Sequence, residues 1–149
     1  MCRGDARADE AGGLDGMVLF PSKEWISLFK EKLNGNVAYK DAAKDWEGDF
    51  LFVITPDNGL THEVVFYVDL WHGTCRNARL AKPKEQAAFV FKGPYSNWKR
   101  VIQGELDPLR GLIRGLFTID GDSKVILDQA KAAQELVNTA KMIPAEFEG

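Results

Sequence analysis

The segment from residue 93 to residue 122 constrains the fold most, because proline, aspartate and glycine mark its helix boundaries. It reads GPYSNWKRVIQGELDPLRGLIRGLFTIDGD. Each of its two prolines suits the first turn of a helix, and Asp107, just before the second one, is a good N-cap. Gly104 and Gly115 stand where helices end. The segment predicts two short helices and then a strand, with apolar side chains rather than reactive ones.

The size and charge of the chain exclude several classes of protein. A length of 149 residues favours one domain that folds without disulfides or metals. A net charge of −3 does not favour contact with a phosphate backbone, so no nucleic-acid partner is expected. The cysteines, Cys2 and Cys75, are not expected to pair, which fits a cytoplasmic location. Residues 1–16 are predicted to be a disordered leader before a single domain at 17–149.

Hydrophobic periodicity predicts the remaining elements. Apolar residues recur at helical spacing between Ser22 and Gly35, and a shorter helix is predicted to carry Tyr39, Ala43 and Trp46. A long helix over 124–141 is predicted to close the domain. Five strands are predicted, at residues 50–54, 64–70, 76–80, 87–91 and 116–120.

The character of these strands defines the fold class. The runs at 50–54 and 64–70 lack clean alternation, which predicts central strands covered on both faces. The polar run at 76–80 indicates an edge strand. Hairpins join the early strands, and helices do not alternate one-for-one with strands. The fold class expected is therefore α+β, with a five-stranded, mostly antiparallel sheet covered by helices.

The reactive residues do not form a recognisable centre. His72 and Cys75 form an H-x-x-C pair after a strand, but a metal site needs two more ligands, and no cofactor or metal is expected. No orienting residue accompanies them as a nucleophile and base. The pair is predicted to lie in a turn between two strands. An enzyme that acts on an apolar substrate through Asp69, His72 and Cys75 remains an alternative.

A spaced pattern in the second half of the chain resembles the signature of the sterol carrier protein 2 family. The resemblance runs from about residue 20 to residue 144, and two further motifs, Trp46-Glu47-Gly48-Asp49 and Asp69-Leu70-Trp71-His72-Gly73, are similar to a prokaryotic branch. Its most specific parts are Ala88-Phe89-Val90, Trp98, Gly104-x-x-Asp107-Pro108 and Gly115-x-x-x-x-x-Gly121-Asp122.

The resemblance implies an apolar tunnel between the sheet and the helices, and non-catalytic binding and transfer of lipids. A fatty acid or acyl thioester is favoured over a sterol, because many prokaryotes make none. Burying acyl methylenes contributes about 0.8 kcal/mol each, so a chain of roughly sixteen carbons gains on the order of 10 kcal/mol before ordering costs. The resemblance leaves open an accessory module that presents acyl substrates to an enzyme, transient membrane contact and a homodimer.

The tunnel is expected to take its lining from three parts of the chain: the strands, the helices of the 93–122 segment as a movable wall, and the closing helix as a guard at one end. The predicted lipid-binding residues are Phe50, Phe52, Phe66, Val68, Phe89, Phe117 and Ile119 from the strands, Trp98, Ile102, Leu109, Leu112 and Ile113 from the movable wall, and Leu127, Ala130, Leu136 and Val137 from the closing helix.

Overall fold

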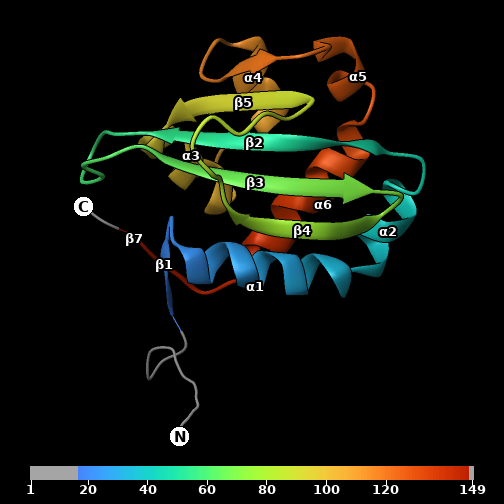
Figure 1. The fold of residues 1–149 in the computed structure, drawn as a ribbon, viewed down its shortest axis with the longest axis horizontal. Helices are drawn as coiled ribbons and strands as arrows, with labels where there is room; N and C mark the ends of the chain where they lie inside the picture. Colours follow the sequence, from blue (N-terminus) through green and yellow to red (C-terminus); the bar gives the residue numbers. More distant parts are fainter. Residues whose placement is uncertain (1–16, 148–149) are drawn as a thin grey trace, which may run out of the picture.

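A five-stranded sheet forms the centre of the molecule (Figure 1). The computed structural model describes residues 17–147, so the predicted leader at 1–16 lies outside the described residues. The spatial order is β4-β3-β2-β5-β6, and every neighbouring pair is antiparallel except β2 and β5. This confirms the α+β class and the edge position of the polar strand. The strands are β2 (Glu47–Thr55), β3 (Val64–Trp71), β4 (Thr74–Leu80), β5 (Phe89–Pro94) and β6 (Thr118–Asp120).

Helices cover one face and both edges of this sheet. Figure 1 shows α3 and α6 behind the sheet, α1 along the β4 edge, and α4 and α5 beyond β5, at the opposite end of the sheet. The helices are α1 (Lys23–Asn34), α2 (Val37–Ala42), α3 (Tyr95–Ile102), α4 (Pro108–Ile113), α5 (Ser123–Leu127) and α6 (Ala130–Lys141). No helix within residues 17–147 is long and apolar enough to cross a bilayer.

The segment from 93 to 122 folds as its punctuation predicts. Asp107 caps α4, because its Oδ1 accepts hydrogen bonds from the backbone N–H of Leu109 at 2.8 Å and of Arg110 at 3.4 Å. Gly104 and Gly115 follow the two helices with φ of 82° and 81°, a conformation that favours glycine. Pro94 is the N-cap of α3 rather than a residue of its first turn.

Two other glycines of this segment make room for one aromatic ring. A Cβ on Gly93 would overlap the ring of Phe117, and a Cβ on Gly111 would lie 2.9 Å from Cδ2 of the same ring. Phe117 is buried and packs edge-on against Trp98, with ring centroids 5.1 Å apart. The glycines therefore let β5, α4 and the start of β6 close around one side chain.

The single closing helix predicted over 124–141 is wrong, because the chain forms two helices there. α5 ends at Leu127 and α6 begins at Ala130, with Gln129 between them at φ −109° and ψ 37°. No glycine or proline marks the break. The change of direction turns Ala130 and Leu127 outward, and neither is buried.

The prediction of two strands covered on both faces holds for β2 and is wrong for β3. Leu51 and Val53 of β2 are buried on the outer face. In β3 buried and half-buried positions alternate, because the outer face carries polar groups there. Tyr67 donates a hydrogen bond of 2.7 Å to Asp49 Oδ2 on that face. The helices therefore cover only the inner face of β3.

The two ends of the described chain pair with each other, which no sequence pattern predicted. β1 (Val18–Phe20) lies parallel to β7 (Ala145–Phe147) in a separate two-stranded sheet. The pairing places the buried ring of Phe20 against Trp25, at the start of α1, with ring centroids 4.8 Å apart. It thereby fixes the N-terminal end of α1 against the sheet.

Candidate functional site

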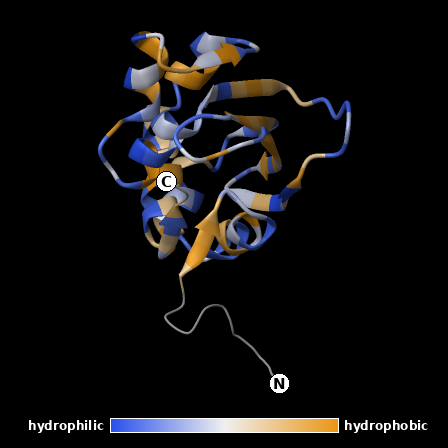
Figure 2. Ribbon diagram, turned by 90° about the vertical axis from the view of Figure 1, so that its left-hand side faces the viewer, coloured by the Kyte–Doolittle hydropathy of each residue, from blue (hydrophilic) through white to orange (hydrophobic). Residues whose placement is uncertain are grey.

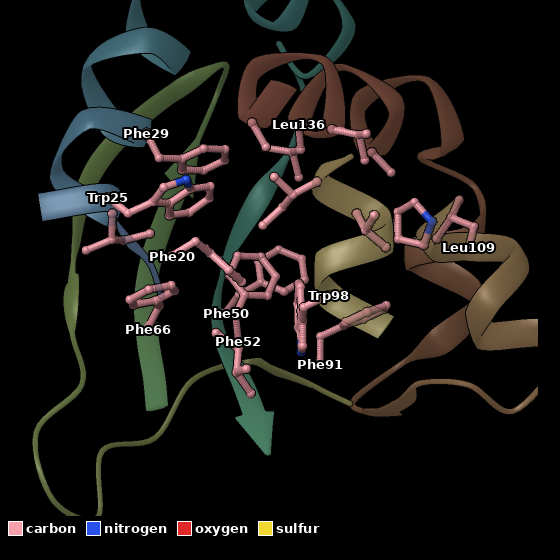
Figure 3. A pocket seen from close by; sticks show the side chains of 18 of the residues that line it. Phe20, Trp25, Phe29, Phe50, Phe52, Phe66, Phe91, Trp98, Leu109 and Leu136 are labelled. Atoms are coloured by element: carbon pink, nitrogen blue, oxygen red, sulfur yellow. The ribbon is translucent and has the colours of Figure 1, made fainter. Parts of the chain in front are cut away.

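An apolar cavity of about 110 Å³ lies between the inner face of the sheet and the helices (Figure 3). No lining residue is charged, and none carries a side-chain oxygen. Its lining consists of Phe20, Trp25, Ile26, Phe29, Phe50, Phe52, Ile54, Phe66, Phe91, Trp98, Val101, Ile102, Pro108, Leu109, Ile126, Ala133, Leu136, Val137 and Ala140. Such a space can take a hydrocarbon group, and it offers an ion no compensating charge.

Strand register builds the sheet side of the cavity. Phe52 of β2 lies opposite Phe66 of β3 and Phe91 of β5, so three phenylalanines form one row across the sheet. Phe50 and Ile54 line the cavity from the same face of β2, because alternate residues of a strand point to the same side. The cavity wall therefore follows directly from the pairing of three central strands.

Trp25, from α1, forms the opposite side. Its indole is sandwiched between Phe29 and Phe66, at centroid distances of 5.3 and 5.9 Å and with nearly parallel planes. Ser22 caps this helix by accepting a 3.0 Å hydrogen bond from the backbone N–H of Trp25. The helix cap and the two stacked rings together fix the position of the indole.

Trp98, from α3, closes the side nearest β5. Its Nε1 donates to the carbonyl oxygens of Val53 and Gly93, both at 3.1 Å. Its ring meets Phe52 and Phe91 edge-on, with centroids 5.6 and 5.7 Å away. These contacts make Trp98 a fixed part of the wall.

A second cavity of about 40 Å³ adjoins the first one. The two share the side chains of Phe50, Ile126, Ala133 and Leu136, so these residues form the partition between them. The polar side chain of Gln129 lies at the second cavity only. Movement of the partition would join the two spaces into one longer passage.

The structure brings half of the predicted lipid-binding residues together. The eight that line the larger cavity are Phe50, Phe52, Phe66, Trp98, Ile102, Leu109, Leu136 and Val137. Figure 3 shows several of them facing one another across it. That these side chains contact a lipid stays a prediction.

The other eight predicted residues lie outside the lining of that cavity. Some are buried in neighbouring packing, while Leu127 and Ile113 are 39% and 73% exposed. Leu127 and Ala130 lie on either side of the break between α5 and α6, away from the cavity. These eight residues are Val68, Phe89, Leu112, Ile113, Phe117, Ile119, Leu127 and Ala130.

Several lining residues were missed in the sequence. Ile54 and Phe91 follow predicted residues by two positions on the same strands, so strand alternation could have found them. Trp25 and Phe29 belong to a predicted helix, but its periodicity does not say what its apolar stripe packs against. Phe20 depends on the unpredicted pairing of the chain ends.

The reactive residues named in the enzyme alternative do not converge on the cavity. Asp69 accepts hydrogen bonds of 3.1 and 3.2 Å from Arg76, and the exposed His72 pairs with Glu47 at 2.6 Å. Cys75 is buried, and burial raises the pKa of its thiol to about 11, so it is protonated at neutral pH. As predicted, His72 lies in a turn that joins two strands, but the prediction is wrong for Cys75, which lies within β4. Within residues 17–147, no cluster of His, Cys, Asp and Glu could hold a metal ion.

Fold and cavity define an α+β domain of the kind that encloses an apolar space between one sheet face and its helices. The sequence profile of the SCP-2 sterol transfer family matches residues 26–134. The chain belongs to this family. No curated protein matches it in sequence.

Solved structures agree with this assignment. A crystal structure of sterol carrier protein 2 is 35% identical and covers 82% of this chain and 97% of its own, with a TM-score of 0.74. The protein TT1886 of Thermus thermophilus, described as a sterol carrier protein candidate, is 36% identical, covers 88% and 93%, and has a TM-score of 0.78. The palmitated SCP2L2 of Aedes aegypti is 13% identical, covers 72% and 93%, and has a TM-score of 0.52, so it shares the fold alone.

Proposed function

We propose that this protein binds a lipid in the apolar cavity and carries it within the cytoplasm without catalysis. The observation that carries the proposal is a lining of apolar side chains alone, in a chain of the SCP-2 sterol transfer family. Each buried methylene of an acyl chain contributes about 0.8 kcal/mol, so the cavity needs no polar contact to bind one. A fatty-acyl chain is the proposed ligand, because its methylene groups supply this binding free energy.

Binding of a whole acyl chain requires the cavity to widen. A volume of about 110 Å³ is below the roughly 150 Å³ of an engineered cavity that accepts benzene. The least anchored part of the wall is formed by α4 and α5, which bury only Gly111 and Ile126 respectively. We expect these helices to move outward and Leu136 to swing aside, which joins the two cavities.

Native mass spectrometry tests this proposal. We expect the delipidated protein, after exposure to vesicles that contain a palmitoyl ester, to gain the mass of one lipid. The gain should disappear when the protein is unfolded, since the cavity exists only in the folded chain. Protein that neither retains lipid from cells nor accepts it from vesicles would overturn the proposed function.

Transfer also requires a place where the protein meets a membrane, and we place it on α4. Ile113 is 73% exposed and stands between the exposed Arg110 and Arg114, while Leu109 of the same helix lines the cavity. Figure 2 shows further hydrophobic positions at the top of the molecule, where α4 and α5 lie. An apolar side chain flanked by arginines suits an anionic bilayer surface.

Substitution Ile113→Asp is expected to weaken binding to phosphatidylglycerol vesicles about tenfold, since burial of an isoleucine in the bilayer surface contributes ~1.5 kcal/mol or more. Vesicle co-sedimentation measures it. The matched control is Val37→Asp, because Val37 is 78% exposed on the remote helix α2. Equal losses for the two variants would count against a docking role for α4.

A further inference from the structure

The second cavity contains a hydroxyl group that the rest of the protein does not use. Tyr39 of α2 lines this cavity and is 1% exposed. Its backbone N–H donates to Asn36 Oδ1 at 3.2 Å, and its carbonyl oxygen accepts from the N–H of Ala43 at 2.9 Å. Within residues 17–147, its hydroxyl has no hydrogen-bond partner. Buried polar groups in native proteins almost always have partners, so this hydroxyl requires an explanation.

The hydroxyl is open to the cavity and is not enclosed by packing. Among residues 17–147, Trp25 Nε1 is the one buried, unpartnered side-chain nitrogen or oxygen that is also shut off from any accessible space. The Tyr39 hydroxyl is unpartnered but not shut off, so it keeps some accessible surface. Because almost no part of Tyr39 reaches the exterior, that surface faces the cavity that the residue lines. A molecule in the second cavity can therefore reach the hydroxyl.

Packing against α6 holds Tyr39 in place. Asn36, the N-cap of α2, donates to Oγ1 of the buried Thr139 of α6 at 2.9 Å. Burial raises the pKa of the Tyr39 hydroxyl above its usual range, so the group stays protonated at neutral pH. The second cavity therefore presents a fixed, neutral O–H donor.

The rest of the second cavity offers no charge. Its other lining residues are apolar except for Trp46, whose Nε1 already donates to the carbonyl oxygen of Gly48 at 3.1 Å, and Gln129, whose amide is uncharged. A carboxylate there would be buried without a compensating cation, which is costly. The volume of about 40 Å³ exceeds the roughly 15 Å³ that one water molecule needs, so a group of a few heavy atoms fits. The cavity therefore suits a small, neutral polar group.

We propose that the second cavity holds the polar end of the lipid, where a neutral ester or thioester carbonyl oxygen accepts a hydrogen bond from the Tyr39 hydroxyl. The acyl chain lies in the larger cavity and passes the partition at Ala133 and Leu136, which line both spaces. A carbonyl oxygen only accepts, so it complements a free donor. This inference rests on the proposed lipid binding and adds the class of ligand, an uncharged acyl ester in preference to a fatty-acid anion.

A pair of matched ligands tests the proposal. Methyl laurate and n-tetradecane have the same number of atoms along the chain, and only the first carries a carbonyl group. The affinity of each for the wild type and for Tyr39→Phe is measured by isothermal titration, with the ligand delivered from cyclodextrin. We expect Tyr39→Phe to bind the ester about tenfold more weakly, which corresponds to ~1.4 kcal/mol, and to bind the alkane as the wild type does. The free energy of unfolding should not fall, because the removed hydroxyl has no partner in the protein.

The control variant is Tyr67→Phe, which removes the same atom from the outer face of the sheet, where it donates to Asp49. It should leave the ratio of ester to alkane affinity at the wild-type value. An unchanged ratio in Tyr39→Phe would overturn the inference while leaving lipid binding in place. A wild type that binds neither molecule would overturn the proposed function and this inference with it.

Infrared spectroscopy of the bound ester tests the hydrogen bond directly. With methyl laurate labelled with ¹³C at the carbonyl carbon, the C=O stretching band should lie at a lower frequency in the wild type than in Tyr39→Phe, because a hydrogen-bond donor weakens the C=O bond. Laurate, which carries a carboxylate, should bind the wild type more weakly than its methyl ester does. Equal frequencies in the two proteins would contradict the hydrogen bond, and tighter binding of laurate would contradict the neutral class of ligand.

Discussion

Replacement of Ala133 by phenylalanine is expected to lower the affinity for a palmitoyl ester about fiftyfold. Ala133 lines both cavities, so a ring at this position would occupy their junction. Loss of room for about three methylene groups removes ~2.4 kcal/mol of binding free energy, which is about fiftyfold in affinity. Isothermal titration with the ester delivered from cyclodextrin measures the loss.

The matched control for this variant lies on the same helix. Ala130 is exposed at the start of α6 and does not line either cavity, although the sequence predicted it as a lipid-binding residue. Ala130→Phe should therefore bind the ester as the wild type does. The free energy of unfolding of Ala133→Phe should stay within ~1 kcal/mol of the wild type, because the ring fills a void instead of crowding a packed core. Equal affinities of the two variants would show that the lipid does not occupy the junction.

The contrast between these two alanines shows where sequence reasoning reaches its limit. Both lie within the helix predicted over 124–141 and both belong to α6, after the break at Gln129, yet only Ala133 lines the cavities. A helix break without glycine or proline has no local signal, because it follows from how α5 and α6 each pack. A helix in this part of the chain could be predicted from the sequence, whereas which of its alanines faces the cavity and which faces solvent could not.

Local chemistry explains what could be predicted. Asp107 accepts from the backbone of its own helix, and the left-handed glycines end helices wherever they stand, so neighbouring residues suffice to place these boundaries. The sheet face of the cavity also follows from alternation along β2, as Phe50, Phe52 and Ile54 show. The helix boundaries marked by Asp107, Gly104 and Gly115 were therefore located correctly, as were Phe50 and Phe52 on the cavity face of β2.

Long-range pairing explains what could not be predicted. Trp25 lines the cavity because α1 packs against the sheet, and Phe20 does so because β1 pairs with β7 at the far end of the chain. Neither partner is encoded within a few residues of the side chain it positions.

Substitution Gly73→Ala is expected to lower the free energy of unfolding by about 3 kcal/mol, the largest loss of stability we predict for a single methyl group. Gly73 has φ of 80°, and a Cβ there would lie 2.7 Å from the carbonyl oxygen of Lys40 and 2.9 Å from its Cα. The left-handed backbone costs ~1–2 kcal/mol for a residue with a side chain, and the contact with the backbone of α2 adds an overpacking cost of ~1–3 kcal/mol. Urea unfolding followed by circular dichroism measures the loss.

Gly115→Ala separates the two contributions, because Gly115 has φ of 81° and a Cβ added to it would meet nothing within 4 Å. Its loss should be about 1 kcal/mol, from the backbone conformation alone. The difference in free energy of unfolding between the two variants then measures the cost of the close contact between the β3–β4 turn and α2. Equal losses of stability would show that the backbone shifts at no cost to relieve this contact. The turn also carries His72 and precedes Cys75, so the same experiment weighs a structural role for this region against the enzyme alternative. If the turn is structural, Gly73→Ala should lower the free energy of unfolding while the folded protein keeps its affinity for lipid. Neither His72 nor Cys75 lines the cavity, and Gly73 does not line it either.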